Sequence, residues 1–379
     1  MSPNTAKDSL QAFCSSIAGL LSSRAVLQGV GVGNPNASPT SALLLHILQD
    51  TSGRIATILF AHRVGTALEP ECKTYRLAAD VFNDIAMILD SLSPGVPAGA
   101  MRVTVLSTAG VLRALCGVAG GSSKASLSAH FAKWGNLAEL NAKDSSQETV
   151  ISLIGMLVGS VVVSQITGIT TTWLVLLVLL GLHLGMNYAA VRAVQMTSLN
   201  RQRTNIVFSA LLDSDSDPDA DAGSSQSAVL TPAQVASQER IFHRDGALHW
   251  TVETTSVYMG SACVGVPMGA FVAENPPLGR LTGLFSGEAY MLYFSEKRHV
   301  SIVLKRGCLV QDQLKAWTHG LLALKLWDGS SEVMGVIEES LAFLNNRDRF
   351  RGYITKLRGV GWNIDIAALE TRSGKRIDI

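Results

Sequence analysis

The chain has 379 residues, a formal net charge of +1, 47% hydrophobic residues and only 16% charged residues. This length allows two or three domains, and the composition is more apolar than that of an ordinary soluble protein. The nearly neutral charge argues against a nucleic-acid partner, because nucleic-acid-binding proteins usually present a concentrated basic surface to the phosphates.

The first 95 residues predict one clear helix. Residues 1–13 contain a single lysine and no apolar run, so we expect neither a secretory signal nor a transit peptide there. The segment Gly29–Gly33 follows a helical pattern instead of a strand, which favours a flexible turn over a dinucleotide-binding loop. Apolar residues recur at helical spacing from Arg76 to Ser91, and Ser93-Pro94-Gly95 would end that helix.

The next segment, Ala98–Gly121, is apolar and rich in small residues, but it contains Arg102 and Arg113. It either packs beside a membrane or partly enters it, and both alternatives remain open. Arginines near the bilayer centre need partners, and the natural acidic candidates are Asp80, Asp84 and Glu148. Residues 117–124 resemble a phosphate-binding P-loop, but serines stand where its second glycine and its lysine belong, so we expect no nucleotide site.

Residues Thr149–Val191 predict a transmembrane helical hairpin. None of these 43 residues is Asp, Glu, Lys or Arg, and His183 is the only ionisable side chain besides Tyr188. About 20 apolar residues cross the hydrocarbon core of a bilayer. The stretch is therefore long enough for two helices, roughly Glu148–Ser164 and Thr171–Val191, separated by a polar, glycine-containing turn.

Charges on both sides of the hairpin give it an orientation. The turn is uncharged, so the positive-inside rule places both outer ends on the cytosolic or matrix-like face; the flanking basic residues are Lys124, Lys133, Lys143, Arg192, Arg201 and Arg203. Gly155 and Gly159 form a GxxxG motif, which allows helix backbones to approach closely in lipid. The alternative is a pair of buried helices in a soluble core, but residues 172–188 are apolar on all sides and show no solvent-facing stripe.

The C-terminal third predicts a linker and a small α+β domain. Asp213–Ser227 has five aspartates at alternate positions and no core-forming residue, which is typical of an exposed flexible segment. Two strands, three helices and a last short strand follow it, at residues 287–295, 299–305, 311–326, 331–345, 348–358 and 362–366. The predicted fold is therefore mainly α: a helical membrane domain (1–212), the linker (213–227) and an α+β domain (228–379).

Several partial motifs predict no chemistry. The aspartate ladder has proline where a calcium-binding loop needs glycine, and serine where it needs the closing glutamate. His243-Arg244-Asp245 spells a kinase triplet without its companion motifs. The five cysteines are widely spaced and the eight histidines are scattered, so we expect neither a disulfide framework nor a metal site, and the cofactor is unknown.

Two polar clusters are the candidate site. The first, on one face of the predicted helix, is Arg76, Asp80, Asn83 and Asp84; the second, before the hairpin, is Asn136, Lys143, Asp144, Gln147 and Glu148. Each also has an ordinary interpretation, as a solvated helix face in the first case and as helix capping and interfacial anchoring in the second. We predict that members of both clusters converge on one buried polar site beside the hairpin: Asp80, Asn83, Asp84, Lys143, Asp144, Gln147 and Glu148.

A family resemblance is carried by residues 8–14, 29–33, 76–84 and above all 136–149 (NLAELNAKDSSQET), followed by 187–203. On these segments the chain resembles the root UVB sensitive (RUS) family over essentially residues 8–212. The similarity continues more weakly in the C-terminal region, where residues 288–305 and Gly361-Trp362 fit the family pattern. No catalytic residues are established for that family, so the resemblance assigns none here.

The resemblance implies a membrane-associated eukaryotic protein. In plants the family is linked to early seedling development, ultraviolet-B responses, auxin transport and vitamin B6 homeostasis, often in plastids. Residues 1–13 lack the features of a plastid leader and the acidic insert departs from the family, so we expect the membrane of an intracellular organelle, which is a mitochondrion, a plastid or part of the endomembrane system.

Two functions remain open, and an enzyme is not expected. The first is a non-enzymatic membrane protein that binds or transports a small polar metabolite, with vitamin B6 compounds suggested by the resemblance. The second is a membrane scaffold whose C-terminal domain recruits a partner protein, which is a family member or another protein. Besides such a protein, the lipid bilayer is the expected partner. A transporter predicts polar clusters that face an interior cavity, whereas a scaffold predicts an exposed apolar patch on the C-terminal domain.

Overall fold

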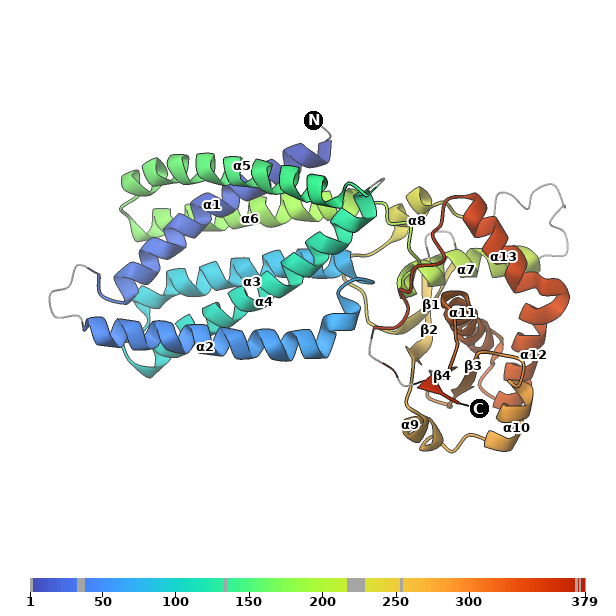
Figure 1. Cartoon of the computed structure of the whole chain (residues 1–379). Helices are drawn as coiled ribbons and strands as arrows, with labels where there is room; N and C mark the ends of the chain where they lie inside the picture. Colours follow the sequence, from blue (N-terminus) through green and yellow to red (C-terminus); the bar gives the residue numbers. More distant parts are fainter. Residues whose placement is uncertain are drawn as a thin grey trace. The chain divides into compact units, whose positions relative to one another are not determined.

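Six long helices form the N-terminal part of the computed structural model, which describes residues 3–32, 38–132, 135–216, 229–252, 255–371, 374 and 376–378. They are α1 (Pro3–Gly29), α2 (Pro39–Val64), α3 (Cys72–Leu92), α4 (Ala100–Phe131), α5 (Leu137–Gln165) and α6 (Ile169–Ala193) (Figure 1). Two short 3-10 turns, Gly65–Ala67 and Ser93–Gly95, connect α2 to α3 and α3 to α4. These helices form one compact unit, residues 1–194, and the rest of the chain forms a second.

The two hairpin helices have the predicted positions, but they do not pack as a simple pair. The turn between them is residues 166–168, as predicted, whereas α5 begins at Leu137 and so includes the polar segment that was expected to precede the membrane helix. Helix α1 packs against both α5 and α6 and lies between them (Figure 1). The hairpin is thus two helices that share α1 as their common partner.

The GxxxG motif is the contact between α5 and α1. A Cβ atom added at Gly155 would lie 2.8 Å from the Ser16 Cβ, and one added at Gly159 would lie 2.8 Å from a Leu20 methyl group and 3.3 Å from the Ile17 Cα. Because these distances are below normal van der Waals contact, glycine is what permits this close approach.

Arg24 of α1 holds the turn of the hairpin. Its guanidinium group donates to the carbonyl oxygens of Val163 (2.9 Å) and Ile166 (2.7 Å), at the end of α5, and to the Thr172 hydroxyl (3.1 Å) in α6. The last carbonyls of a helix have no partner within the helix. Arg24 therefore satisfies the C-terminus of α5 and connects it to the first turn of α6.

Helix α4 packs against both α2 and α3, and α3 also packs against α1. Ser38 caps α2, and Pro39 occupies its first position, where a missing N–H has no consequence. In the described part of the chain, four helices are long and apolar enough to cross a membrane: residues 7–29, 100–131, 137–165 and 169–193. Most of the segment Ala98–Gly121 lies in one of these helices, α4, which begins at Ala100, and its length and composition are compatible with either alternative. Residues 117–124 lie inside α4 instead of forming a loop.

The C-terminal unit, residues 195–379, is built on a mixed sheet of β1 (Ala247–Val252), β2 (Thr255–Val264), β3 (Tyr290–Phe294), β4 (His299–Lys305) and β5 (Arg376–Ile377). The strand order is β1-β2-β4-β3, with β5 paired to β4; β2 and β5 run parallel to β4, and β3 runs antiparallel to it. The helices of the unit are α7 (Arg201–Ser216), α8 (Pro232–Gln238), α9 (Met268–Val272), α10 (Leu278–Leu284), α11 (Val310–Leu326), α12 (Val333–Asn345) and α13 (Arg349–Gly359).

Helix α11 packs on the sheet and supplies Trp317, which is fully buried in a large apolar core. The Trp317 indole donates to the Asn205 amide oxygen (2.8 Å), and the Asn205 amide donates to the Ala247 carbonyl (2.8 Å), which joins α11, α7 and β1. Helix α7 therefore belongs to the C-terminal unit, whereas the sequence had placed residues up to 212 with the membrane helices.

The same packing places two of the basic residues that were predicted to flank the hairpin inside the C-terminal unit. Arg203 is buried in an ion pair with Glu239 (2.9 Å), and Arg201 pairs with Asp245 (2.6 Å), all within the C-terminal unit. Both arginines therefore belong to ion pairs of the C-terminal unit, whereas Lys124, Lys143 and Arg192 belong to the helical unit that contains the hairpin. Lys133 lies outside the described residues.

Most predicted elements of the C-terminal unit are confirmed. Strands β3 and β4 pair as a hairpin, and α11, α12 and α13 match the three predicted helices. The strand predicted at 362–366 is wrong, because only Asn363 forms an isolated bridge, with Ser198. The predicted linker is also wrong at its start, since α7 continues to Ser216; residues 217–227 lie outside the described part of the chain.

Candidate functional site

Two aspartates of α3 and two polar residues of α6 meet inside the helical unit. Asp80 and Asp84 are four residues apart, as are His183 and Asn187, so each pair lies on one face of its helix. The order of contacts shows that α3 and α6 run antiparallel here: Asp80 accepts a hydrogen bond from the Asn187 amide, and the Asp84 carboxylate contacts His183. Gln11 of α1 is the fifth member, and its amide also donates to Asp80.

The imidazole of His183 lies between the two carboxylates. Its Nδ1 is 2.7 Å from one oxygen of Asp84, and its Nε2 is 3.7 Å from Asp80 and 3.5 Å from the Gln11 amide nitrogen. The side chains of His183 and Asp84 are only 3% and 9% exposed. We call these five residues, Gln11, Asp80, Asp84, His183 and Asn187, the buried polar cluster.

The buried polar cluster is incompletely satisfied within the described residues. The second oxygen of Asp84 is buried and has no hydrogen-bond partner there. An acceptor without a donor in a buried site carries a free-energy cost of about 1–3 kcal/mol. A site with two carboxylates, one imidazole and a spare acceptor can hold a proton or receive a hydrogen-bond donor from a ligand. Among the described residues no group of three or more acidic, histidine or cysteine side chains could hold a metal ion.

A second buried charge lies further along α3. Asp90, whose side chain is 1% exposed, accepts hydrogen bonds from Arg113 of α4 and from the Ser22 hydroxyl of α1 (3.2 Å). The prediction that Arg113 pairs with Asp80, Asp84 or Glu148 is therefore wrong. Arg102 instead donates to the carbonyl oxygens of Val96 and Gly29.

The residues of the second predicted cluster lie at the exposed start of α5. Lys143 pairs with Glu139 one turn away (2.5 Å), and Lys124 of α4 pairs with both Asp144 (2.8 Å) and Glu148 (2.7 Å). Gln147 and Asn136 are also exposed. These five positions do not share a buried site with Asp80 and Asp84, so the predicted convergence is not formed.

The first predicted cluster is divided in the same way. Asp80 and Asp84 point into the bundle, whereas Arg76 and Asn83 are half-buried on the same helix. Arg76 is close enough to interact electrostatically with Asp80 and with Asp8 of α1. Sequence reasoning missed Gln11, His183 and Asn187 as site residues. The signal for His183 was present, because an ionisable residue inside a predicted transmembrane segment is a candidate functional residue by itself.

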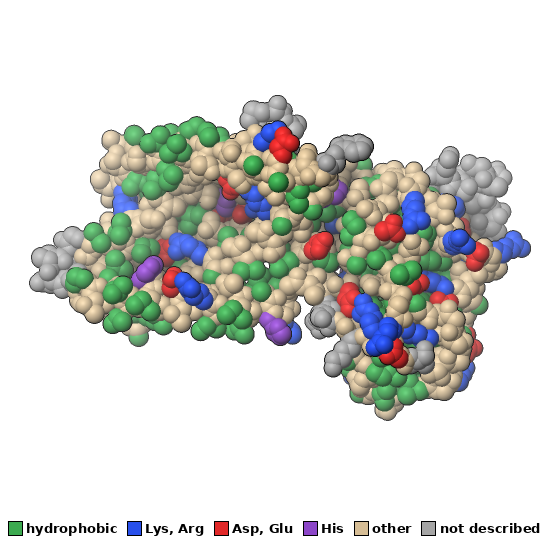
Figure 2. Space-filling view, viewed as in Figure 1, with side chains coloured by type: hydrophobic (Ala, Val, Ile, Leu, Met, Phe, Trp, Pro, Cys, Tyr) green, Lys and Arg blue, Asp and Glu red, His purple; other side chains and the backbone are tan. Residues whose placement is uncertain are grey.

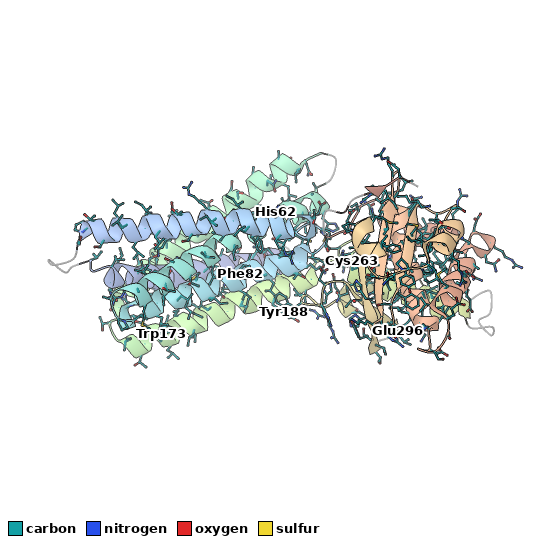
Figure 3. All side chains as sticks on the ribbon, turned by 90° about the horizontal axis from the view of Figure 1, so that it is seen from below. His62, Phe82, Trp173, Tyr188, Cys263 and Glu296 are labelled. Carbon is teal, nitrogen blue, oxygen red and sulfur yellow. The ribbon has the colours of Figure 1, made fainter. Side chains whose placement is uncertain are left out.

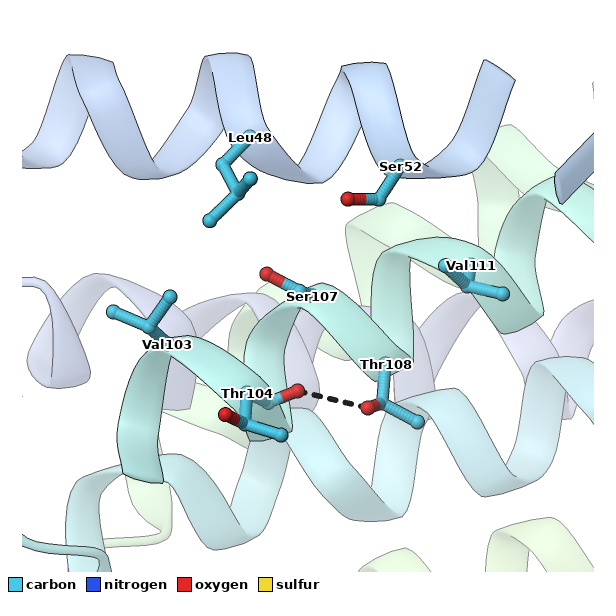
Figure 4. Close-up of a pocket in the computed structure, with 7 residues that line it drawn as sticks. All are labelled: Leu48, Ser52, Val103, Thr104, Ser107, Thr108 and Val111. Carbon is cyan, nitrogen blue, oxygen red and sulfur yellow. Dashed lines mark hydrogen bonds between the residues drawn. The ribbon is translucent and has the colours of Figure 1, made fainter. Parts of the chain in front are cut away.

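A separate groove of about 360 Å³ lies between α2 and α4 (Figure 4). It is lined by apolar and hydroxyl side chains: Leu48, Ser52, Val103, Thr104, Ser107, Thr108 and Val111. The Thr108 hydroxyl donates to the Thr104 carbonyl (2.8 Å), as Thr side chains often do in helices. The groove shares no residue with the buried polar cluster.

The helical unit combines buried ionisable groups with exposed apolar side chains. Its interior contains Asp80, Asp84, Asp90 and His183 beside apolar residues, and its clustered apolar core is small. Large apolar side chains cover its outer faces, and Figure 2 shows them along α5 and α2. The C-terminal unit has the opposite arrangement, with one large apolar core.

Comparisons with known proteins place these features in a family. A family model described as "Vitamin B6 photo-protection and homoeostasis domain" matches residues 5–215, which is more than half of the chain. "Protein root UVB sensitive 3" of Arabidopsis thaliana is 30% identical over 366 residues, which are 94% of this chain and 78% of that protein. The chain belongs to the RUS family.

Other RUS proteins are similar over different lengths. "RUS family member 1" of Dictyostelium discoideum is 40% identical over 238 residues, which are 62% of this chain and 43% of that protein, so the chain spans less than half of this relative. "Protein root UVB sensitive 2, chloroplastic" of Arabidopsis thaliana is 22% identical over 94% of this chain and 76% of its own length. No solved structure matches the chain. The matched RUS domain, residues 5–215, contains every member of the buried polar cluster.

Proposed function

We propose that this RUS protein is an integral membrane protein that binds or transports a small polar metabolite at its buried polar cluster, without catalysis. The observation that carries the proposal is the cluster itself: two carboxylates and an imidazole inside a bundle that exposes many large apolar side chains. Ionisable groups inside a membrane domain are costly, and they usually line a substrate or ion pathway. The matched domain is described by vitamin B6 photo-protection and homoeostasis, which makes a vitamin B6 compound the first metabolite to test.

The membrane location is supported by the surface of α6. Leu174, Leu177 and Val178 are each more than half exposed, and the helix that carries them is long and apolar enough to cross a bilayer. Trp173 and Tyr188 lie toward the two ends of the same helix (Figure 3). Fifteen residues of α-helix separate them by about 22 Å, and such aromatic side chains favour the two membrane interfaces.

Labelling and extraction test this location. Single-cysteine variants at Lys143 and Arg192 should react from one side of sealed vesicles, and a variant at Thr167, in the turn, should react from the other. Release of the protein by alkaline carbonate would contradict membrane integration. A fluorescent fusion imaged with organelle markers would assign the mitochondrion, the plastid or the endomembrane system, and "chloroplastic" in the name of one relative makes the plastid the first to examine.

Ligand binding is tested with purified protein. We expect pyridoxal phosphate, pyridoxal or pyridoxine to raise the melting temperature of the wild-type protein, and Asp84→Asn to remove the effect because it changes the buried carboxylate. Asp144→Asn is the matched control, since it makes the same change on the exposed start of α5. If none of the three compounds shifts the wild-type protein, the vitamin B6 assignment fails; if both variants respond alike, the site is elsewhere.

A scaffold role is the second candidate, and one surface favours it. The end of the β1–β2 hairpin exposes Val252, Val257 and Tyr258, which are each about half accessible. Exposed apolar groups of this kind are typical of protein interaction sites, and β1 is an edge strand of the sheet. A scaffold predicts that Val257→Lys releases a co-purifying RUS protein while metabolite binding is unchanged; retention of that protein would contradict this role.

A further inference from the structure

The C-terminal unit contains an open pocket of about 530 Å³ at one end of its sheet. Residues 286–289, which lead into β3, form one wall, and the end of β4 together with β5 forms the other. Two basic residues, Lys305 and Arg306, line it where β4 ends. The volume lies within the range of small-molecule sites, about 300–1,000 Å³.

Lys305 is unusual because it is buried, with a relative exposure of 8%. Its ammonium group donates one hydrogen bond, to the Phe285 carbonyl oxygen at 2.7 Å. An ammonium group has three N–H donors, and no other acceptor for Lys305 occurs among the described residues. Two donors of a buried cation are thus available at the wall of the pocket.

The carboxylates near the pocket already pair with other basic side chains. Glu288 accepts two hydrogen bonds from Lys315 (2.7 and 2.6 Å) and one from the Asn345 amide (2.9 Å). Asp378 pairs with Arg306 at 3.0 Å. Within the described chain, therefore, each acidic residue at the pocket has a basic partner, and Lys305 is left as one excess positive charge.

An unpaired buried charge is unfavourable, and an anion is what compensates it. We propose that Lys305 anchors a binding site for a small molecule with a carboxylate or phosphate group. One anionic oxygen accepts from the Lys305 ammonium. The Ser286 hydroxyl and the Arg306 guanidinium lie at the exposed edge of the pocket, where they can take a further oxygen. The Arg306–Asp378 pair is largely solvent-exposed, so little free energy opposes its opening.

Calorimetry on the full chain in detergent tests the site, with inorganic phosphate and acetate as probes and chloride at equal ionic strength as the reference. Saturable binding of phosphate or acetate is expected, and Lys305→Met should weaken it at least tenfold. Lys297→Met is the matched control, because Lys297 is an exposed lysine in the β3–β4 turn of the same unit, and it should bind as the wild type does. Binding that is absent for both anions, or unchanged in Lys305→Met, would overturn the site.

A second variant keeps the test decisive if Lys305→Met does not fold. Ser286→Asp places a carboxylate at the exposed edge of the pocket, where it should compete for the ammonium group and weaken anion binding about tenfold. Wild-type affinity in Ser286→Asp would contradict the proposal. A short-chain phosphatidic acid that binds more than tenfold tighter than phosphate would instead assign the pocket to a lipid headgroup and overturn the small-molecule assignment.

Discussion

The contact between α1 and α5 yields the sharpest prediction, because two glycines create it. Alanine at Gly155 would place its Cβ 2.8 Å from the Ser16 Cβ and 3.2 Å from the Phe13 carbonyl oxygen. Neither atom is the mobile end of a long side chain, so one helix must move. Gly181 of α6 provides the control, since a Cβ there meets no atom within 4 Å.

The magnitude follows from two terms. Replacing glycine by alanine inside a helix gains about 1 kcal/mol in helix propensity at either position. Overpacking adds a penalty of about 1–3 kcal/mol at Gly155 only. The difference between Gly155→Ala and Gly181→Ala therefore isolates the packing term, and it should be about 1–3 kcal/mol in favour of Gly181→Ala.

The buried thiol of Cys14, on α1, reports the undocking of that helix. Peptide-resolved thiol labelling of the purified protein should show Cys14 reacting roughly 5–150 times faster in Gly155→Ala than in Gly181→Ala, which corresponds to about 1–3 kcal/mol of opening free energy. Equal labelling rates in the two variants would refute the close approach of α1 and α5.

Further predictions concern a buried ion pair, the acidic segment and a buried histidine. Arg113→Leu should destabilise the helical unit by about 3–5 kcal/mol, because it leaves Asp90 buried without its cation; adding Asp90→Asn should restore part of the loss in a detergent unfolding titration, and no restoration would contradict the pairing. Deleting residues 217–224 should leave thermal stability near wild type, whereas Asp213→Ala should cost about 1 kcal/mol through the hydrogen bond that Asp213 accepts from a tryptophan. Burial lowers the pKa of His319 to about 4. Because the unfolded chain binds the proton near pH 6.5 and the folded chain does not, the C-terminal unit should lose up to about 3 kcal/mol between pH 7 and pH 4; urea unfolding that is independent of pH would contradict this.

The local pattern of apolar, polar and charged residues was sufficient to predict the elements whose signal is local. The uncharged stretch of α5 and α6 and the alternating strands β3 and β4 carry their own pattern, and each has the predicted position. Helix α1 was missed because Ser, Gln and Arg interrupt its apolar residues, and these polar residues turned out to make its contacts with the neighbouring helices. The polar residues of α1 are explained only by the neighbouring helices with which they form hydrogen bonds.

The candidate site was predicted in part for a related reason. Asp80 and Asp84 were identified from their helix face, but His183 and Asn187 lie about 100 residues away in the chain, and register between α3 and α6 is a property of the folded bundle. The residues near Lys143 were assigned to the same site because the first membrane helix was expected to begin at Glu148. Since α5 begins earlier, their charges are satisfied by neighbours one turn away or on α4.

The hydrogen bonds from Arg24 to the α5–α6 turn have a consequence for biosynthesis. Its acceptors are 139 to 148 residues later in the chain, so α1 leaves the ribosome long before the groups that it must bind. During that interval α1 has neither α5 nor α6 as a partner, and its arginine and buried polar residues must remain hydrated or be shielded by other proteins. Assembly of the bundle is consequently a late event, completed only when the sixth helix arrives, and a nascent chain stalled before Thr172 would expose an unassembled first helix to quality control.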